Sequence, residues 1–302
     1  MFDSMKIKSA VTLLTLLALL CAGCQKQRSQ EESRAAQTPQ RIVSISPNVT
    51  EILYAVGAWQ QVVAVSQYCS YPDDVKNKPR VSGWDKTNLE ELTFLKPDLV
   101  IGVDLQAPFL QDKLNGLGVR SLFLRTESLT DVYNSIEQVG KVSGHEQQAA
   151  DLLLKTKAEI ETIRKKVSNR PQIKVLCIID RVPGTLRELH TATRGSYLDE
   201  LITIARGESI SPPAEHGWGK ITKEAVVSLN PEVIIDMVQG SKGDFGEDPI
   251  AAWRELSEVR AVTNNRVYSI TDPLVIHPSQ FVSHTAQVFA RAIHPEAFSD
   301  GP

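Results

Sequence analysis

Two tryptophans occupy matching positions in the two halves of this 302-residue chain. Trp84 precedes Glu90 by six residues, and Trp218 precedes Glu224 by the same six. An indole presents a large, rigid, mostly apolar surface, which suits the binding of a broad and partly apolar ligand. We therefore expect the two rings to face a ligand from opposite walls of a cleft. The alternative is that each tryptophan packs on the core of its own half.

The sequence lacks the common residue patterns that support catalysis or hold a metal. The chain has no Walker phosphate loop, dinucleotide fingerprint or Gly-x-Ser-x-Gly elbow, and no His-Glu-x-x-His or paired Cys-x-x-Cys motif. None of the six histidines lies in residues 41–140, so two walls could not share a metal through imidazoles. We expect no enzyme activity, no metal site and no resident cofactor. A hydrolase or oxidoreductase on a similar scaffold and a scaffold lipoprotein are the alternatives from other functional classes.

The composition is that of an ordinary globular protein. Hydrophobic residues make up 42% of the chain, which is too much for a disordered chain, and the net charge is −3. Because there is no basic excess, we expect no nucleic-acid partner. The cysteines are too few for a disulfide scaffold. We expect Cys69 and Cys177 to be unbridged, with Cys177 a small buried apolar residue.

The first residues indicate export. Lys6 and Lys8 precede an apolar run over residues 10–22. That run is shorter than the roughly 20 residues of a membrane-spanning helix and is typical of a secretory signal. Small residues before Cys24 resemble a bacterial lipobox, in which the cysteine is lipidated, although Cys21 stands where leucine is usual. The alternative is a plain signal peptide with incidental cysteines.

Short apolar runs that alternate with helical patterns predict an α/β fold. Thr50–Gly57 has a helical pattern, whereas the runs expected to form strands are short and rich in β-branched residues. Alternation of this kind is typical of a mostly parallel sheet with helices on both faces. The expected strands are Arg41–Ser46, Val62–Val65, Leu99–Val103, Ser121–Leu124 and, opening a second series, Ile173–Ile179.

The two series share one detailed motif. Glu90–Ile101 and Glu224–Ile235 both begin with glutamate, continue to Leu-x-Pro-acid and end in a β-branched strand. Proline ends the preceding helix and favours extended geometry in the residue before it. The same junction at matched offsets predicts two related lobes.

A long helical pattern over His145–Val167 lies between the two series. Apolar residues recur there at helical spacing, and Ser143 followed by Glu146 is typical of a capping box. At about 1.5 Å per residue the helix would span roughly 33 Å, so one rigid helix would join the lobes. The alternative is an ordinary crossover helix within one large sheet.

These patterns together predict how the chain is divided. Residues 25–40 are polar and lack a large apolar side chain, which is typical of a flexible tether. The predicted parts are a lipoprotein signal peptide (1–23), a tether (24–40), an N-terminal α/β lobe (41–142), an inter-lobe helix (143–170) and a C-terminal α/β lobe (171–302).

Motifs within residues 41–298 resemble those of one known family. They are Arg41–Pro47, Thr50–Ile52, Val63–Pro72, Val81–Trp84, Asn88–Glu90 and Leu95–Ile101. With these motifs the chain is similar to the cobalamin and iron-siderophore periplasmic binding proteins, which are solute receptors of ABC importers, and most similar to the cobalamin receptors.

The resemblance implies two α/β lobes joined by one long helix, with a single ligand in the cleft. The implied ligand is a corrinoid such as cobalamin, carried as cargo rather than as a cofactor; a haem or a ferric siderophore is the alternative. The residues implied to contact the corrin ring are Tyr68, Trp84, Trp218 and Asp272. His216 or His277 could then approach the cobalt, since neutral imidazole is a good cobalt ligand.

The same resemblance implies partners at a membrane. Glu90 and Glu224 would dock onto arginines of the importer's permease, which works with an ATPase. Lipid on Cys24 would anchor the chain in the periplasm or at the outer face of the cytoplasmic membrane. The alternative for both glutamates is a solvated acid in the first turn of a helix, where the helix dipole favours it.

Some positions depart from the family pattern. Ile276 stands where the cobalamin receptors have a pocket arginine, and Val103 stands where they have another tryptophan. The family's Arg-Pro-x-Pro-Arg region is Ile276-His277-Pro278-Ser279-Gln280 in this chain. These changes bear on which ligand is bound rather than on the class of receptor.

Overall fold

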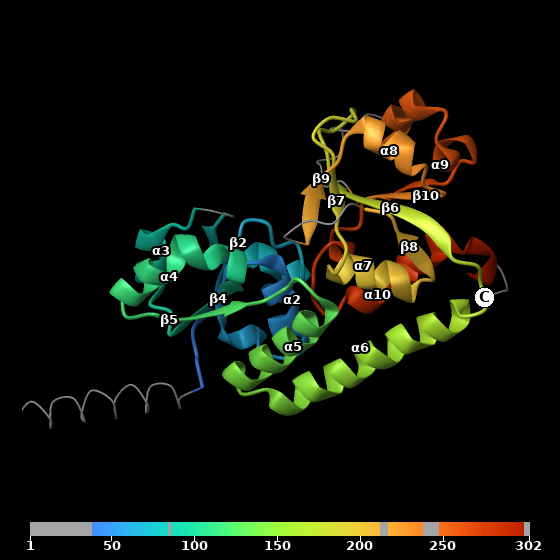
Figure 1. Ribbon diagram of the computed structural model, residues 1–302. Helices are drawn as coiled ribbons and strands as arrows, with labels where there is room; N and C mark the ends of the chain where they lie inside the picture. The colour runs from blue at the N-terminus through green and yellow to red at the C-terminus, as the bar shows by residue number, and fades with distance from the viewer. Residues whose placement is uncertain (1–37, 84–85, 212–216, 238–247, 299–302) are drawn as a thin grey trace, which may run out of the picture. The chain divides into compact units, whose positions relative to one another are not determined.

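The computed structural model describes residues 38–83, 86–211, 217–237 and 248–298. The chain divides into two units, Met1–Pro39 and Gln40–Pro302, and both lobes lie in the second unit (Figure 1). The predicted signal peptide, most of the tether and Cys24 lie outside the described residues, as do Trp84 and His216.

The N-terminal lobe is built on a parallel sheet in the order β3-β2-β1-β4-β5. Strands β2 and β4 are nearly continuous apolar runs, as expected where helices cover both faces of a parallel sheet. Each predicted strand of this lobe is present, and β3 is an additional edge strand. The strands are β1 (Ile42–Ser44), β2 (Val62–Ser66), β3 (Arg80–Ser82), β4 (Leu99–Val103) and β5 (Arg120–Leu124).

Helices cover both faces of this sheet (Figure 1). Successive strand residues point to opposite faces, so Ile42 joins one core and Val43 the other. The first core lies under α2 (Pro47–Ala55) and α5 (Leu129–Ser143). The second lies under α3 (Leu89–Leu95) and α4 (Ala107–Gly116).

The C-terminal lobe is built on a sheet in the order β11-β10-β6-β7-β9, with β8 also paired to β6. Strands β6, β8, β10 and β11 are parallel, whereas β7 is antiparallel to both β6 and β9. The predicted α/β class is confirmed, but this second sheet is mixed. Its strands are β6 (Ile173–Asp180), β7 (His190–Ala192), β8 (Gly207–Ser209), β9 (Trp218–Lys220), β10 (Val233–Asp236) and β11 (Val267–Ser269).

Helices also cover both faces of the mixed sheet. One face packs against α7 (Tyr197–Ile204) and α10 (Val282–Ile293). The other packs against α8 (Lys223–Leu229), α9 (Arg260–Thr263) and the short helix η4 (Ala251–Leu256). The remaining 3-10 turns are η1 (Trp59–Gln61), η2 (Asp73–Asn77), η3 (Asp104–Gln106), η5 (Pro273–Val275) and η6 (Pro295–Phe298).

The long helix between the lobes is α6 (Glu146–Val167), as predicted, but its predicted capping box is wrong. Ser143 is instead the last residue of α5, and Gly144, with a φ of 77°, is the C-cap of that helix. The Ser143 hydroxyl therefore donates backward to the Val139 carbonyl, at 2.7 Å. His145 is the N-cap residue and makes no side-chain cap.

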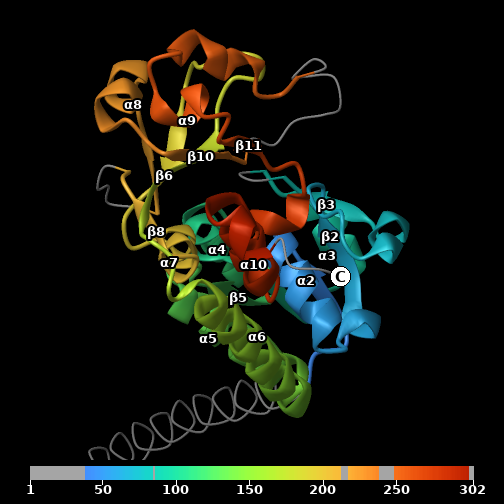
Figure 2. The ribbon, with the colours of Figure 1, turned by 90° about the vertical axis from the view of Figure 1, so that its right-hand side faces the viewer.

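Helix α5 lies beside α6 (Figure 2), and both helices contribute to the cores of both lobes. Helix α6 contributes Leu153 to the N-terminal core and Ile160 to the C-terminal core. Helix α5 contributes to both cores as well. The helices approach closely at Gly140, where an added Cβ would lie 2.2 Å from the Ala149 Cβ. The joint is thus a tightly packed helix pair, which favours a fixed arrangement over a hinge.

Candidate functional site

The predicted repeat is present as two equivalent helix-to-strand junctions. Asn88 caps α3 by accepting from the Glu91 amide at 3.1 Å, and Thr222 caps α8 by accepting from the Ala225 amide at 3.2 Å. Both helices end at a left-handed residue, Lys96 with φ 47° and Asn230 with φ 46°. The two seven-residue helices therefore start and stop at matching positions.

The acid after each proline ties its junction to the first strand of its own lobe. The Asp98 carboxylate accepts from the Arg41 amide, and the Asp98 amide donates to the Arg41 carbonyl. In the C-terminal lobe, Glu232 makes the same two contacts with Lys174. The acid in the Leu-x-Pro-acid motif thus has a structural role, whereas the glutamate at the start of the motif takes no part in these contacts.

Glu90 and Glu224 are both the second residue of their helices, and both are exposed. The pKa of Glu224 is lowered by hydrogen bonds from its own backbone amide and from the Thr222 hydroxyl. Such a carboxylate stays ionised and is available to a cationic partner. Exposure at equivalent positions is what docking requires, although a solvated helix acid would lie there too.

Two of the aromatic residues predicted to bind ligand present much of their surface to solvent. Tyr68 follows the carboxyl end of β2 and is 54% exposed; Trp218 opens β9 and is 47% exposed. Trp218 is thus not a fully buried core residue, and its ligand contact stays a prediction. Trp84, just beyond the end of β3, lies outside the described residues, so its ligand contact stays a prediction.

His190 is a neighbour of Trp218 that the sequence pattern did not reveal. The two rings meet edge to face, with centroids 5.6 Å apart. In the ladder between β7 and β9, His190 pairs with Lys220 and Ala192 pairs with Trp218, which puts their side chains on one face. The Nδ1 atom of His190 is buried and has no hydrogen-bond partner in the described part of the chain. Only strand register brings these residues together.

Asp272, the fourth predicted ligand contact, is engaged in local structure. Its Oδ1 accepts from the Leu274 amide at 3.0 Å and caps η5. Its Oδ2 lies 2.9 Å from Nε2 of His284. Both side chains are half-exposed, so a ligand contact by Asp272 stays a prediction that would share the carboxylate with His284.

The segment that departs from the family's Arg-Pro-x-Pro-Arg pattern packs against helix α2. Glu51 is buried there, and its Oε1 lies 2.6 Å from Nδ1 of His277. The Ser279 hydroxyl donates to Oε2 of Glu51 at 2.6 Å, and the Gln280 side-chain amide donates to the Glu51 backbone carbonyl at 3.3 Å. This carboxylate therefore links the two lobes. Because Glu51 holds Nδ1 of His277, only Nε2 of that ring is left for the cobalt contact hypothesised above.

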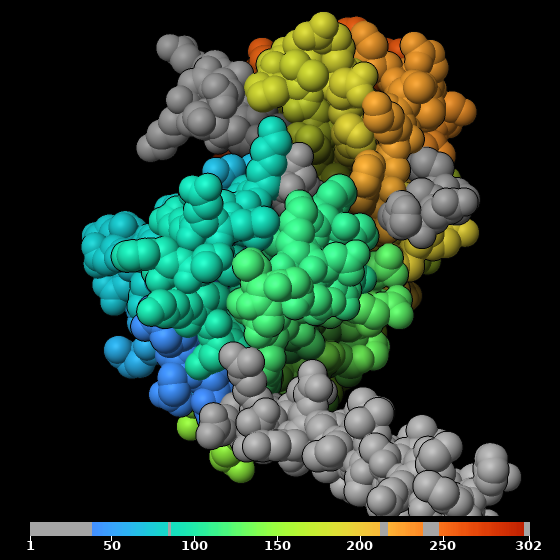
Figure 3. Space-filling model, turned by 90° about the vertical axis from the view of Figure 1, so that its left-hand side faces the viewer, coloured from blue at the N-terminus to red at the C-terminus, as the bar shows by residue number. Residues whose placement is uncertain are grey.

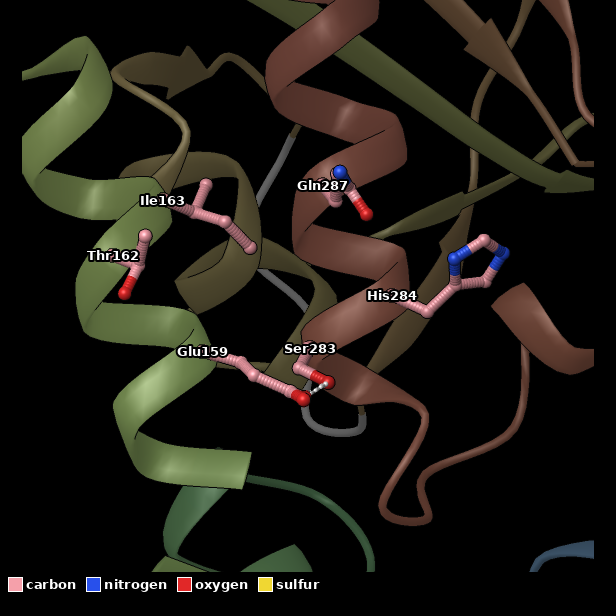
Figure 4. A pocket seen from close by; sticks show the side chains of 6 residues that line it. All are labelled: Glu159, Thr162, Ile163, Ser283, His284 and Gln287. Carbon is pink, nitrogen blue, oxygen red and sulfur yellow. Dashed lines mark hydrogen bonds between the residues drawn. The ribbon is translucent and has the colours of Figure 1, made fainter. Parts of the chain in front are cut away.

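A separate hollow of about 340 Å³ lies between α6 and α10 (Figure 4). Ser283 donates there to Oε2 of Glu159 at 2.7 Å, and His284 is bonded to Asp272. Each of these two side chains thus has a carboxylate partner. No group of three His, Cys, Asp or Glu able to hold a metal occurs within the described residues.

Cys69 and Cys177 are both buried and free, and burial raises the pKa of each thiol. Neither is therefore activated as a nucleophile. Among the helices of residues 38–83, 86–211, 217–237 and 248–298, none has the length and apolar character of a membrane span.

Solved structures of other proteins have the same fold as this chain. The periplasmic vitamin B12 binding protein of Vibrio cholerae matches 87% of this chain and 99% of its own, with a TM-score of 0.73 at 23% identity. A periplasmic heme binding protein from Pseudomonas aeruginosa gives a TM-score of 0.73 at 21% identity, over 85% of this chain and 93% of its own. At these identities the likeness shows the fold alone.

Relatives in sequence cover most of the chain. An uncharacterized ABC transporter substrate-binding lipoprotein of Bacillus subtilis is 27% identical over 95% of this chain and 97% of its own length. A vitamin B12-binding protein of Yersinia pestis is 27% identical over 66% of this chain and 70% of its own. The family model described as periplasmic binding protein matches residues 42–274. The chain thus belongs to the periplasmic binding protein family.

Proposed function

We propose that this protein is the solute-binding receptor of an ABC importer and that its ligand is a corrinoid such as cobalamin. The observation that carries the proposal is the exposure of Tyr68 and Trp218, one in each lobe of a periplasmic binding protein. Aromatic rings that a soluble protein leaves exposed at strand ends favour a broad, partly apolar ligand. A relative named as a vitamin B12-binding protein supports the choice of a corrinoid.

The proposed partners are a permease and its ATPase. The Bacillus subtilis relative bears the name of an ABC transporter substrate-binding lipoprotein, which supports both this partnership and lipid anchoring at Cys24. Export would place the receptor in the periplasm or at the outer face of the cytoplasmic membrane. Glu90 and Glu224 would meet cationic side chains of the permease, one from each lobe.

Haem is the second candidate ligand, and Tyr68 is the reason. A phenol is an established axial ligand of haem iron, and the Tyr68 ring is more than half exposed at a strand end. A neighbour in structure is named as a heme binding protein. A ferric siderophore is the third possibility within the same fold.

A titration against cyanocobalamin, cobinamide, haem and a ferric siderophore tests the proposal. We expect cobalamin or cobinamide to bind tightest, and Trp218→Ala to weaken that binding by about tenfold, which is about 1.4 kcal/mol. Leu154→Ala removes a side chain that is 72% exposed on α6 and is the matched control. If the receptor binds haem and Tyr68→Phe abolishes that binding, haem replaces the corrinoid as the proposed ligand. If the receptor binds none of these ligands, the proposal is wrong.

A further inference from the structure

The two proposed docking helices present unequal surfaces. Phe94 lies four residues after Glu90 in α3, so the two side chains share one face of that helix. Phe94 is 83% exposed, the highest value among the large hydrophobic side chains of the described residues. The side of the N-terminal lobe that carries α3 and α4 faces the viewer in Figure 3.

The equivalent position of α8 carries a small polar residue. Because the two helices start and stop in register, Phe94 corresponds to Ser228, which is also exposed. The position after the shared glutamate differs too, with Glu91 in α3 and Ala225 in α8. Helix α3 therefore presents more negative charge and more apolar surface than its counterpart.

Folding of the lobe does not account for Phe94. The inner side of α3 is supplied by Leu92, which is fully buried, and by Leu89 and Leu95, which pack against the same core. An aromatic ring on the opposite side adds nothing to that core. Single exposed apolar side chains are common, but aromatic residues are enriched at interfaces, and Phe94 is exposed one turn from a glutamate that is proposed to dock.

We propose that Phe94 is an apolar anchor through which the N-terminal lobe docks onto the importer's permease, and this rests on the proposed function. The partner surface would place an apolar pocket about one helical turn from the cationic side chain that meets Glu90. The C-terminal lobe would dock through Glu224 with no aromatic anchor on α8. The receptor would then contact the two sides of its importer with unequal strength.

Receptor-stimulated ATP hydrolysis tests this inference. The probe is the permease–ATPase complex that takes up the ligand in the source cells, purified into vesicles of phosphatidylethanolamine and phosphatidylglycerol and titrated with full-length receptor. We expect Phe94→Ser, which makes α3 resemble α8, to raise the half-stimulating receptor concentration by about five- to tenfold. Phe94→Leu should retain most of the effect, and ligand affinity and melting temperature should not change.

Two control variants separate this inference from the proposed function. Ser228→Ala, at the equivalent position, and Leu154→Ser, on α6, should both behave as wild type. If Phe94→Ser also behaves as wild type, or if all three variants weaken stimulation equally, the anchor is wrong. If the receptor gives no stimulation at all, or if reversing Glu90 and Glu224 leaves stimulation intact, the proposed docking role itself fails.

Discussion

The two lobes share one order of five strands but differ in the direction of the second strand and in the extra strand β8 of the C-terminal lobe. From the edge strand inward, the sheets run β3-β2-β1-β4-β5 and β9-β7-β6-β10-β11. Strand β9 is antiparallel to β7, which is antiparallel to β6, so β9 runs with β6 just as β3 runs with β1. The second strand differs, since it is parallel as β2 and reversed as β7, and β8, which pairs with β6, has no counterpart in the described part of the N-terminal sheet.

The connections explain the reversal. Residues 45–61 between β1 and β2 include α2, which is long enough for the crossover that parallel strands need. Residues 181–189 between β6 and β7 contain no helix, so the chain turns back and pairs at once. The edge strand, helix and following strand are nevertheless alike in both lobes. This unit of edge strand, helix and following strand, rather than β2 or β7, positions the paired glutamates and Trp218.

The largest expected effect comes from reversing the charge of the paired glutamates, one in each lobe. Glu90→Arg combined with Glu224→Arg should reduce uptake of the ligand into cells to background, because each reversed charge would repel a cationic partner. Ligand affinity in solution should be unchanged, which an equilibrium titration would check. Normal uptake by the double variant would leave the glutamates as solvated helix acids only.

The structural features that depend on local sequence pattern could be predicted from the sequence. The N-terminal strands, α6 and the matched junctions follow from apolar periodicity and from the Leu-x-Pro-acid motif. The direction of β7 could not be predicted, since three residues carry no periodic signal. The Glu51–His277 contact joins residues 226 positions apart, and the pairing of His190 with Trp218 depends on register.

A large loss of stability is expected where the two lobes are joined. Gly140→Ala would bring a new Cβ to 2.2 Å from the Ala149 Cβ, so α5 and α6 would have to separate. Overpacking of this kind costs about 1–3 kcal/mol in the free energy of unfolding, measurable by urea denaturation.

Two variants show whether the loss is specific to the joint. At Gly116, the last residue of α4, an added Cβ meets nothing within 4 Å, so Gly116→Ala should be neutral or slightly stabilising. Adding Ala149→Gly to the Gly140→Ala variant should recover part of the loss. Equal destabilisation by the substitutions at 140 and 116 would mean that close approach of α5 and α6 is not the cause.

A smaller effect is expected at the carboxylate that links the lobes. Two donors, His277 Nδ1 and the Ser279 hydroxyl, each face one oxygen of buried Glu51. Glu51→Gln keeps one oxygen for His277 but places an amide nitrogen against the Ser279 hydroxyl, which would have to change from donor to acceptor. Both contacts would also lose their charged acceptor, at a cost of about 1–2 kcal/mol in the free energy of unfolding. Glu159→Gln, at a half-exposed carboxylate bonded to Ser283, should cost less than about 0.5 kcal/mol. Equal losses would remove the special role of Glu51.

The smallest expected effect separates the two junctions at the residues that end their helices. Lys96 and Asn230 both have left-handed φ values, 47° and 46°, where a Cβ is crowded by its own backbone. Asparagine tolerates this region better than lysine, so the N-terminal junction should hold more strain. Lys96→Gly should therefore raise the free energy of unfolding by about 0.5 kcal/mol. Asn230→Gly should instead lower it by about 0.5 kcal/mol, because the Asn230 side-chain oxygen accepts from the Arg260 amide at 2.9 Å and glycine removes that acceptor. Urea denaturation of both variants would measure the difference, and an equal gain at both positions would mean that the two junctions, which match in geometry, match in strain as well.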